Sequence, residues 1–116
     1  MRARILMLAG VTRRDRHQAT TAVIDAITDA GGWLADSTRF SNIAITLRFT
    51  IPAGSLAGWG AALAAAGVVL DDESRASLVD RGQTARDPDV EVTAALSLTF
   101  IHNEPDLRQE VPAVPG

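Results

Sequence analysis

The clearest pattern along the chain is a two-residue alternation from Ile43 to Ile51. Every odd position in this stretch carries a large apolar side chain, and the even positions carry alanine, threonine or arginine. A period of two predicts a strand with one face on a core and the other toward solvent or a partner. Pro52, which has no N–H to donate to a neighbouring strand, ends it.

Two other stretches repeat with the period of a helix. In residues 19–30 the apolar side chains recur at spacings of three and four, which places them on one stripe of a helix. The preceding residues 12–15 fit a capping box, and the glycines at 31–32 supply a left-handed stop. A second helix is predicted over residues 55–67, where large apolar residues share one stripe and alanines fill the rest.

Three further strands are predicted, from apolar runs at residues 4–11 and 68–70 and from a short mixed stretch at residues 33–40. The resulting order is strand, helix, strand, strand, helix, strand. This order is the βαββαβ plan of the ferredoxin-like folds. We therefore expect an α+β fold in which an antiparallel sheet carries both helices on one face.

The character of the chain changes after the last of these strands. Residues 71–89 are polar and contain a glycine and a proline, so they predict an exposed loop. Residues 90–101 alternate again and predict an extra C-terminal strand, and residues 102–116, with three prolines, predict an irregular tail. The expected organisation is one domain over residues 1–101, with its core in residues 3–70.

The extra strand 90–101 bears on assembly. An unpaired strand edge of this length would invite aggregation. We expect the strand to pair across a dimer interface or within an extended sheet, and pairing inside its own chain is the alternative.

Composition narrows the function classes. The chain has 116 residues, of which 47% are hydrophobic, and it contains no cysteine, which excludes disulfides, thiolate metal sites and cysteine nucleophiles. A net charge of −3 argues against a nucleic-acid partner, because such binding depends on neutralising phosphates. The opening apolar run is shorter than a signal peptide's, and no stretch is long enough to span a membrane, so we expect a cytoplasmic protein.

Several of these stretches together resemble the ACT domain family, most closely the type found in glycine-cleavage-system transcriptional repressors. The resemblance lies in the Asp15-Arg16 pair, the helix 19–30, the run AGGWLADS at residues 30–37, and the strand 43–51 with the Pro-Ala that follows it. It implies a non-catalytic regulatory module that binds an amino acid or similar small carboxylate and acts as a homo-oligomer. By family position, the ligand-binding residues would be Thr12, Arg13, Asp15, Arg16, Gly32 and Trp33.

One departure from the family pattern keeps an alternative open. The family's first loop reads Gly-x-Asp-Arg-Pro-Gly, whereas His17-Gln18 stand here in place of Pro-Gly. The bulkier pair narrows the usual pocket. The alternative is an oligomerisation or protein-interaction domain without a ligand, assembled through the extra strand.

The arginines and histidines are the remaining candidates for chemistry. Five of the eleven arginines lie in the first sixteen residues, where they could bind an anion at a helix N-terminus or pair with the acids at 71–73. His17 and His102 are the only histidines, and their spacing matches no metal-ligand motif. We therefore predict no metal, no cofactor and no catalytic residues, and a small ferredoxin-like enzyme ranks last among the alternatives.

Overall fold

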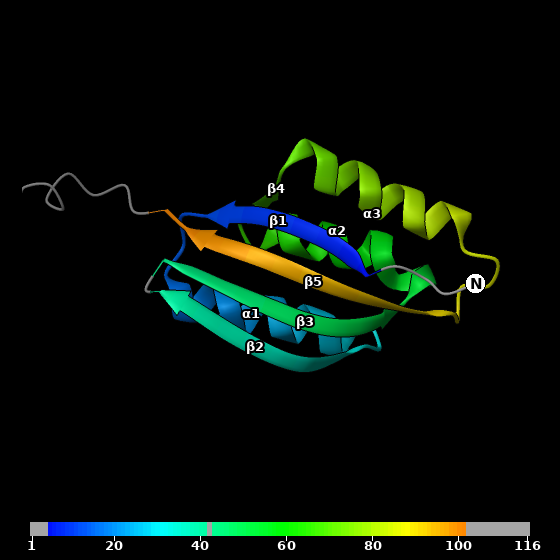
Figure 1. Ribbon diagram of the computed structural model, residues 1–116, viewed down its shortest axis with the longest axis horizontal. Coiled ribbons are helices and arrows are strands. Elements are labelled where there is room, and N and C mark those ends of the chain that lie inside the picture. The colour runs from blue at the N-terminus through cyan, green and yellow to red at the C-terminus, as the bar shows by residue number, and fades with distance from the viewer. Residues whose placement is uncertain (1–4, 42, 102–116) are drawn as a thin grey trace, which may run out of the picture.

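The computed structural model describes residues 5–41 and 43–101, which form a sheet with helices on one side and along one edge (Figure 1). The predicted irregular tail, the first four residues and His102 lie outside the described residues. In chain order the elements are β1 (Leu6–Thr12), α1 (Arg16–Asp29), β2 (Trp33–Ser41), β3 (Ala44–Pro52), a short 3-10 turn (Ala53–Ser55), α2 (Leu56–Ala65), β4 (Val68–Leu70), α3 (Asp72–Thr84) and β5 (Glu91–Phe100).

The five strands form one mixed sheet in the order β2-β3-β5-β1-β4. Three of its four pairings are antiparallel, but β5 runs parallel to β1. The expectation of an α+β fold is confirmed, and the arrangement is compatible with a ferredoxin-like fold. The expectation of a wholly antiparallel sheet is wrong, because β5 lies between β1 and β3 and matches the direction of β1.

The extra strand β5 is the centre of the sheet. It pairs with β1 along Leu6–Thr12 on one side and with β3 along Ala44–Pro52 on the other. Both hydrogen-bonding edges of β5 are therefore occupied within the chain. The expectation that this strand pairs with a partner chain is therefore wrong for the folded domain. The structure instead contains the alternative, in which the strand pairs within its own chain.

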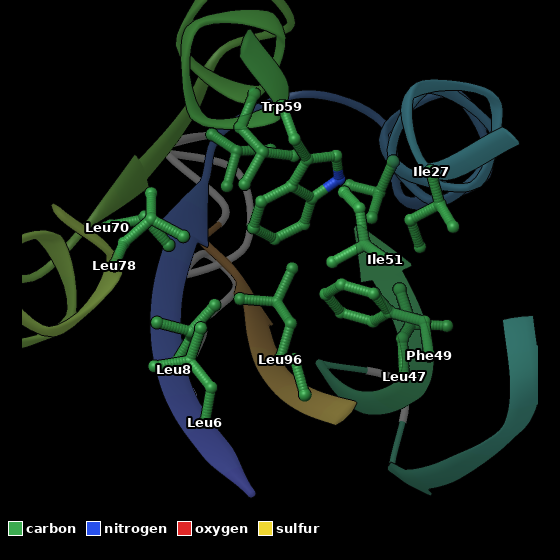
Figure 2. Packing of buried hydrophobic residues seen from close by; sticks show 14 of the residues in the cluster. Leu6, Leu8, Ile27, Leu47, Phe49, Ile51, Trp59, Leu70, Leu78 and Leu96 are labelled. Carbon is green, nitrogen blue, oxygen red and sulfur yellow. The ribbon is translucent and has the colours of Figure 1, made fainter. Parts of the chain in front are cut away.

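The core lies between the sheet and the two helices behind it (Figures 1 and 2). Its centre is the contact between Phe49 of β3 and Trp59 of α2, whose ring centroids are 4.9 Å apart at an interplanar angle of 46°. Tilted aromatic pairs at this distance are favourable beyond the area that they bury. Val23 and Ile27 of α1 and Leu96 of β5 are fully buried in the same cluster.

The prediction of an exposed loop over 71–89 is wrong, because most of it is helix α3. Asp71 caps this helix by accepting a hydrogen bond from the Ser74 N–H at 2.8 Å, and Asp72 and Glu73 occupy the first turn, where negative charge is favourable. Only Ser74 and Leu78 of its thirteen residues are buried. The helix is so polar that its period is almost invisible in the sequence.

None of the helices in the described part of the chain is long and apolar enough to cross a membrane.

Candidate functional site

A small hollow lies where α1 begins and β2 ends. Its volume is about 130 Å³. The first two turns of α1, the end of β2 and two apolar residues of the sheet line it: Arg16, His17, Thr20, Thr21, Arg39, Ser41, Ile45 and Phe100. We call it the α1 hollow.

The strand directions bring these residues together. β3 is antiparallel to both β2 and β5, and β5 is parallel to β1, so β1 and β2 run the same way. The end of β2 therefore lies at the same end of the sheet as the end of β1, where α1 begins. This is why Ser41 and Arg39 face the first turns of α1.

The turn into α1 is held by local hydrogen bonds. The Thr12 hydroxyl donates to the Gly67 carbonyl oxygen at 2.9 Å and accepts the Arg14 N–H at 3.2 Å. Asp15 is the N-cap of α1, since its carboxylate accepts the Gln18 N–H at 3.0 Å. Arg16 is therefore the first residue of α1. It lines the hollow at the N-terminal end of the helix, where the helix carries a partial positive charge.

The charge of the hollow is suited to an anion. The lining contains two guanidinium groups, from Arg16 and Arg39, and three hydroxyls that can donate hydrogen bonds. None of the described residues that line it is an aspartate or a glutamate. The N-terminus of α1 adds its partial positive charge at the same place.

The predicted ligand-binding residues divide between two ends of the molecule. Arg16 lines the hollow, whereas Thr12 is buried and Asp15 is a helix cap, so these two shape the turn. Gly32 and Trp33 follow α1, whose 14 residues span about 21 Å. They therefore lie at the opposite end of the sheet, and one chain does not bring all the predicted residues together.

The structure also places the other three predicted residues, Arg13, Gly32 and Trp33. Arg13 is exposed and does not line the hollow. Gly32 allows a close approach to β3, since a Cβ there would lie 2.3 Å from the Thr50 carbonyl oxygen. Trp33 is 49% exposed and pairs with Thr50 in the β2–β3 ladder.

The other arginines expected around this loop do not line the hollow as the structure describes it. Arg14 donates to the Ala66 carbonyl oxygen at 2.9 Å and thereby satisfies the C-terminal end of α2. Asp72, one of the acids expected to pair with the N-terminal arginines, instead forms an ion pair with Arg75 in the next turn of α3. Arg2 and Arg4 lie outside the described residues.

Sequence reasoning missed Thr20, Thr21, Arg39 and Ser41. The first two could have been found, because Arg16–Thr20 and His17–Thr21 are spaced by four and share a helix face. Arg39 and Ser41 depend on how β2 aligns with the rest of the sheet, for which a single sequence holds no signal. Within the part of the chain that the structure describes, no three histidine, aspartate or glutamate side chains gather as metal ligands would.

No protein-family model matches the chain, and neither a curated protein nor a solved structure matches it.

Proposed function

We propose that this chain is a non-catalytic, ACT-like regulatory module that binds an amino acid or a similar small carboxylate in the α1 hollow and acts as a homodimer. The observation that carries the proposal is the pair of arginines, Arg16 and Arg39, at the start of a helix in a hollow whose described lining residues include no aspartate or glutamate. Guanidinium groups match a carboxylate in charge and in planar geometry. The hydroxyls of Thr20, Thr21 and Ser41 add donors for its second oxygen.

The size of the hollow restricts the ligand. A volume of about 130 Å³ is well below the roughly 300–1,000 Å³ of sites for drug-sized ligands, so the ligand would be small. The smallest amino acids and short monocarboxylates meet this limit. His17 occupies part of the wall, which favours the smallest of them.

The dimer is proposed to form through the outer edge of β2. Every residue of this nine-residue strand except Leu34 is exposed, and β2 is the last strand on its side of the sheet. The register with β3 is irregular at Leu34/Asp36 and at Arg39/Ser41, so the stretch between these positions is the part that a partner strand would pair.

This dimer would also reunite the divided site. Two copies of β2 that pair antiparallel run in opposite directions, so the start of one strand meets the end of the other. Trp33 of the partner subunit would then lie beside the Arg39–Ser41 end of β2, next to the α1 hollow. The ligand would be enclosed between two chains, and binding would strengthen the dimer.

The test is a thermal-shift and calorimetric titration with the twenty amino acids, acetate and propionate. We expect one of the smaller ligands to raise the melting temperature, and at a hundred times its Kd to add about 2.7 kcal/mol of stability. Arg39→Gln should abolish the shift, and Arg13→Gln, at an exposed arginine outside the hollow, should leave it unchanged. Absence of any shift at millimolar ligand, or equal losses in both variants, contradicts the proposal.

A second candidate is an assembly domain without a ligand, and the long exposed edge of β2 favours it. Light scattering separates the two. A dimer that forms in the absence of every tested ligand, and whose stability none of them changes, supports the assembly domain. A monomer at micromolar concentration contradicts both forms of dimerisation.

A further inference from the structure

Helix α2 has the composition of a buried helix but lies at the surface. Its sequence, LAGWGAALAA, contains no charged, hydroxyl or amide side chain. Leu56, Trp59 and Leu63 face the core, while Ala57, Ala61 and other small residues of the opposite side are exposed. A helix that is apolar all round is normally covered on every side.

An apolar groove follows this helix. α2 and α3 lie antiparallel, since Gly60 approaches Leu78 in the middle and Gly82 approaches Leu56 at one end. The groove between them and β4 has a volume of about 640 Å³, within the range of small-molecule sites. We call it the α2–α3 groove.

The lining of the groove is almost wholly aliphatic. It consists of small residues of α2 and branched side chains of α3 and β4, and none of its described residues is aromatic. Val79 of α3 is unusually open for its type, at 55% exposed. An aliphatic chain in the groove would cover it, whereas a flat ring would find no aromatic partner among the described residues of the lining.

The groove has one charged end. Among the described residues that line it, Arg75 alone carries a charge. The Arg75 guanidinium forms an ion pair with Asp72 and donates a 3.5 Å hydrogen bond to the Leu70 carbonyl oxygen. Because a guanidinium has five N–H donors, further donors remain. Gln83 lines the groove eight residues further along α3, about 12 Å away at 1.5 Å per residue.

We propose that the α2–α3 groove binds an aliphatic monocarboxylate of medium chain length, with its carboxylate on Arg75 and its chain along α2 toward Gln83. The N–H donors that Arg75 retains beside its ion pair with Asp72 suit a carboxylate at one end of the groove, and the aliphatic lining suits an aliphatic body. A chain of about ten carbons has the required length, since each C–C bond is about 1.5 Å and an extended chain zigzags.

This ligand differs from the small carboxylate of the α1 hollow in size and in the residues that hold it. Among the residues that the structure describes, none lines both sites. The inference therefore stands on its own if the α1 hollow proves empty, and Arg39→Gln should leave it unaffected.

The probe is decanoate below its micellar concentration, followed by calorimetry and by amide chemical shifts of α2 and α3. Ala57→Phe, which fills the groove, should weaken binding by about tenfold or more, because a new ring removes the volume that the chain occupies. Ala61→Phe is the matched control, since Ala61 is exposed on the same helix but does not line the groove. It should change the affinity by less than about twofold.

Two further variants test the charge. Arg75→Gln should weaken decanoate by about tenfold and leave 1-decanol unchanged, because only the acid has a carboxylate for the guanidinium. Val79→Asp, at an exposed position that tolerates a polar side chain, should repel decanoate without unfolding the protein.

Three outcomes overturn the proposal. The first is no decanoate binding by the wild-type chain, and the second is an equal effect of Ala57→Phe and Ala61→Phe. The third is a change of oligomeric state in Ala57→Phe with no change in decanoate affinity, which would assign the groove to a second copy of the chain.

Discussion

The hydroxyl oxygen of Ser74 in α3 accepts the backbone N–H of Ala9 in β1 at 2.8 Å. The Ala9 carbonyl oxygen accepts the Asp71 N–H at 3.0 Å. β4 pairs only with Gly10–Thr12, so these two bonds continue the edge of β1 where the outer strand has already ended. Ser74 of α3 and its N-cap Asp71 thus satisfy the backbone groups of Ala9 that a longer edge strand would otherwise pair. Less of β1 is therefore open to pairing with other chains.

Ser74→Ala should therefore destabilise the protein by about 1–2 kcal/mol, because Ser74 is buried and its loss leaves the Ala9 N–H without an acceptor. Urea unfolding measures the loss, and hydrogen exchange should show the Ala9 amide exchanging faster than its neighbours in β1. Ser77→Ala, one turn further along α3, is the control and should cost less than about 0.5 kcal/mol. Equal costs in the two variants would show that the Ser74 bond adds nothing.

The cap of α3 predicts a dependence of stability on pH. Hydrogen bonds from the side chain and backbone of Ser74 lower the pKa of Asp71 below its ordinary value of 3.8, and the charge of Arg75 acts in the same direction. A carboxyl whose pKa is lower in the folded state contributes stability above its unfolded pKa and loses it as the pH falls through the folded pKa.

Asp71→Asn keeps a capping oxygen but does not titrate. Between pH 7 and the acid range below about 4, the wild-type chain should lose more stability than the variant, and the two unfolding curves should converge at the lowest pH. Thermal unfolding followed by circular dichroism across this range measures the difference. Curves that stay parallel would mean that Asp71 contributes no pH dependence.

The central place of β5 makes the fold depend on the last described strand. A chain that ends at Thr84 lacks the neighbour of both β1 and β3, so the two halves of the sheet have no ladder between them. We expect this shortened chain to be unfolded by circular dichroism and by amide chemical-shift dispersion. Addition of a peptide of residues 85–116 should restore the native spectrum, and a shortened chain that folds alone would contradict the arrangement.

The elements that a single sequence predicts well are those whose faces differ strongly in polarity. β3, β5 and α1 each bury one regular set of apolar side chains, so their periods are visible. α3 buries only Ser74 and Leu78, and its one visible signal is the cap at Asp71 with the acids that follow. Alternation also reports which face of a strand is buried and not which strands lie beside it, so the place of β5 could not be read from its pattern.

The candidate site follows the same division. The place of Arg16 at the start of α1 is predictable, because the capping residues that mark a helix start lie next to it in the sequence. Arg39 reaches the hollow only because β2 and β1 run in the same direction, a relationship set by the pairing of β3 with β5. Gly32 and Trp33 were expected at the site from a local resemblance, yet the length of α1 places them at the other end of the sheet.

Gly32 and Gly58 make a matched pair for the last prediction. A Cβ on Gly32 would lie 2.3 Å from the Thr50 carbonyl oxygen and 3.0 Å from the Ile51 Cα, both rigid backbone atoms of β3. Gly32→Ala should therefore push β2 away from β3 and cost more than about 2 kcal/mol.

Gly58 lies in the middle of α2 and is exposed, and apart from its chain neighbours and the backbone of its own helix no atom of the described residues lies within 4 Å of an added Cβ. Gly58→Ala should stabilise the protein by about 1 kcal/mol, because alanine loses less backbone entropy than glycine on entering a helix. Chemical denaturation of the two variants beside the wild type measures both effects. If Gly32→Ala and Gly58→Ala change the free energy of unfolding in the same direction, the close approach of β2 to β3 is not the reason for a glycine at position 32.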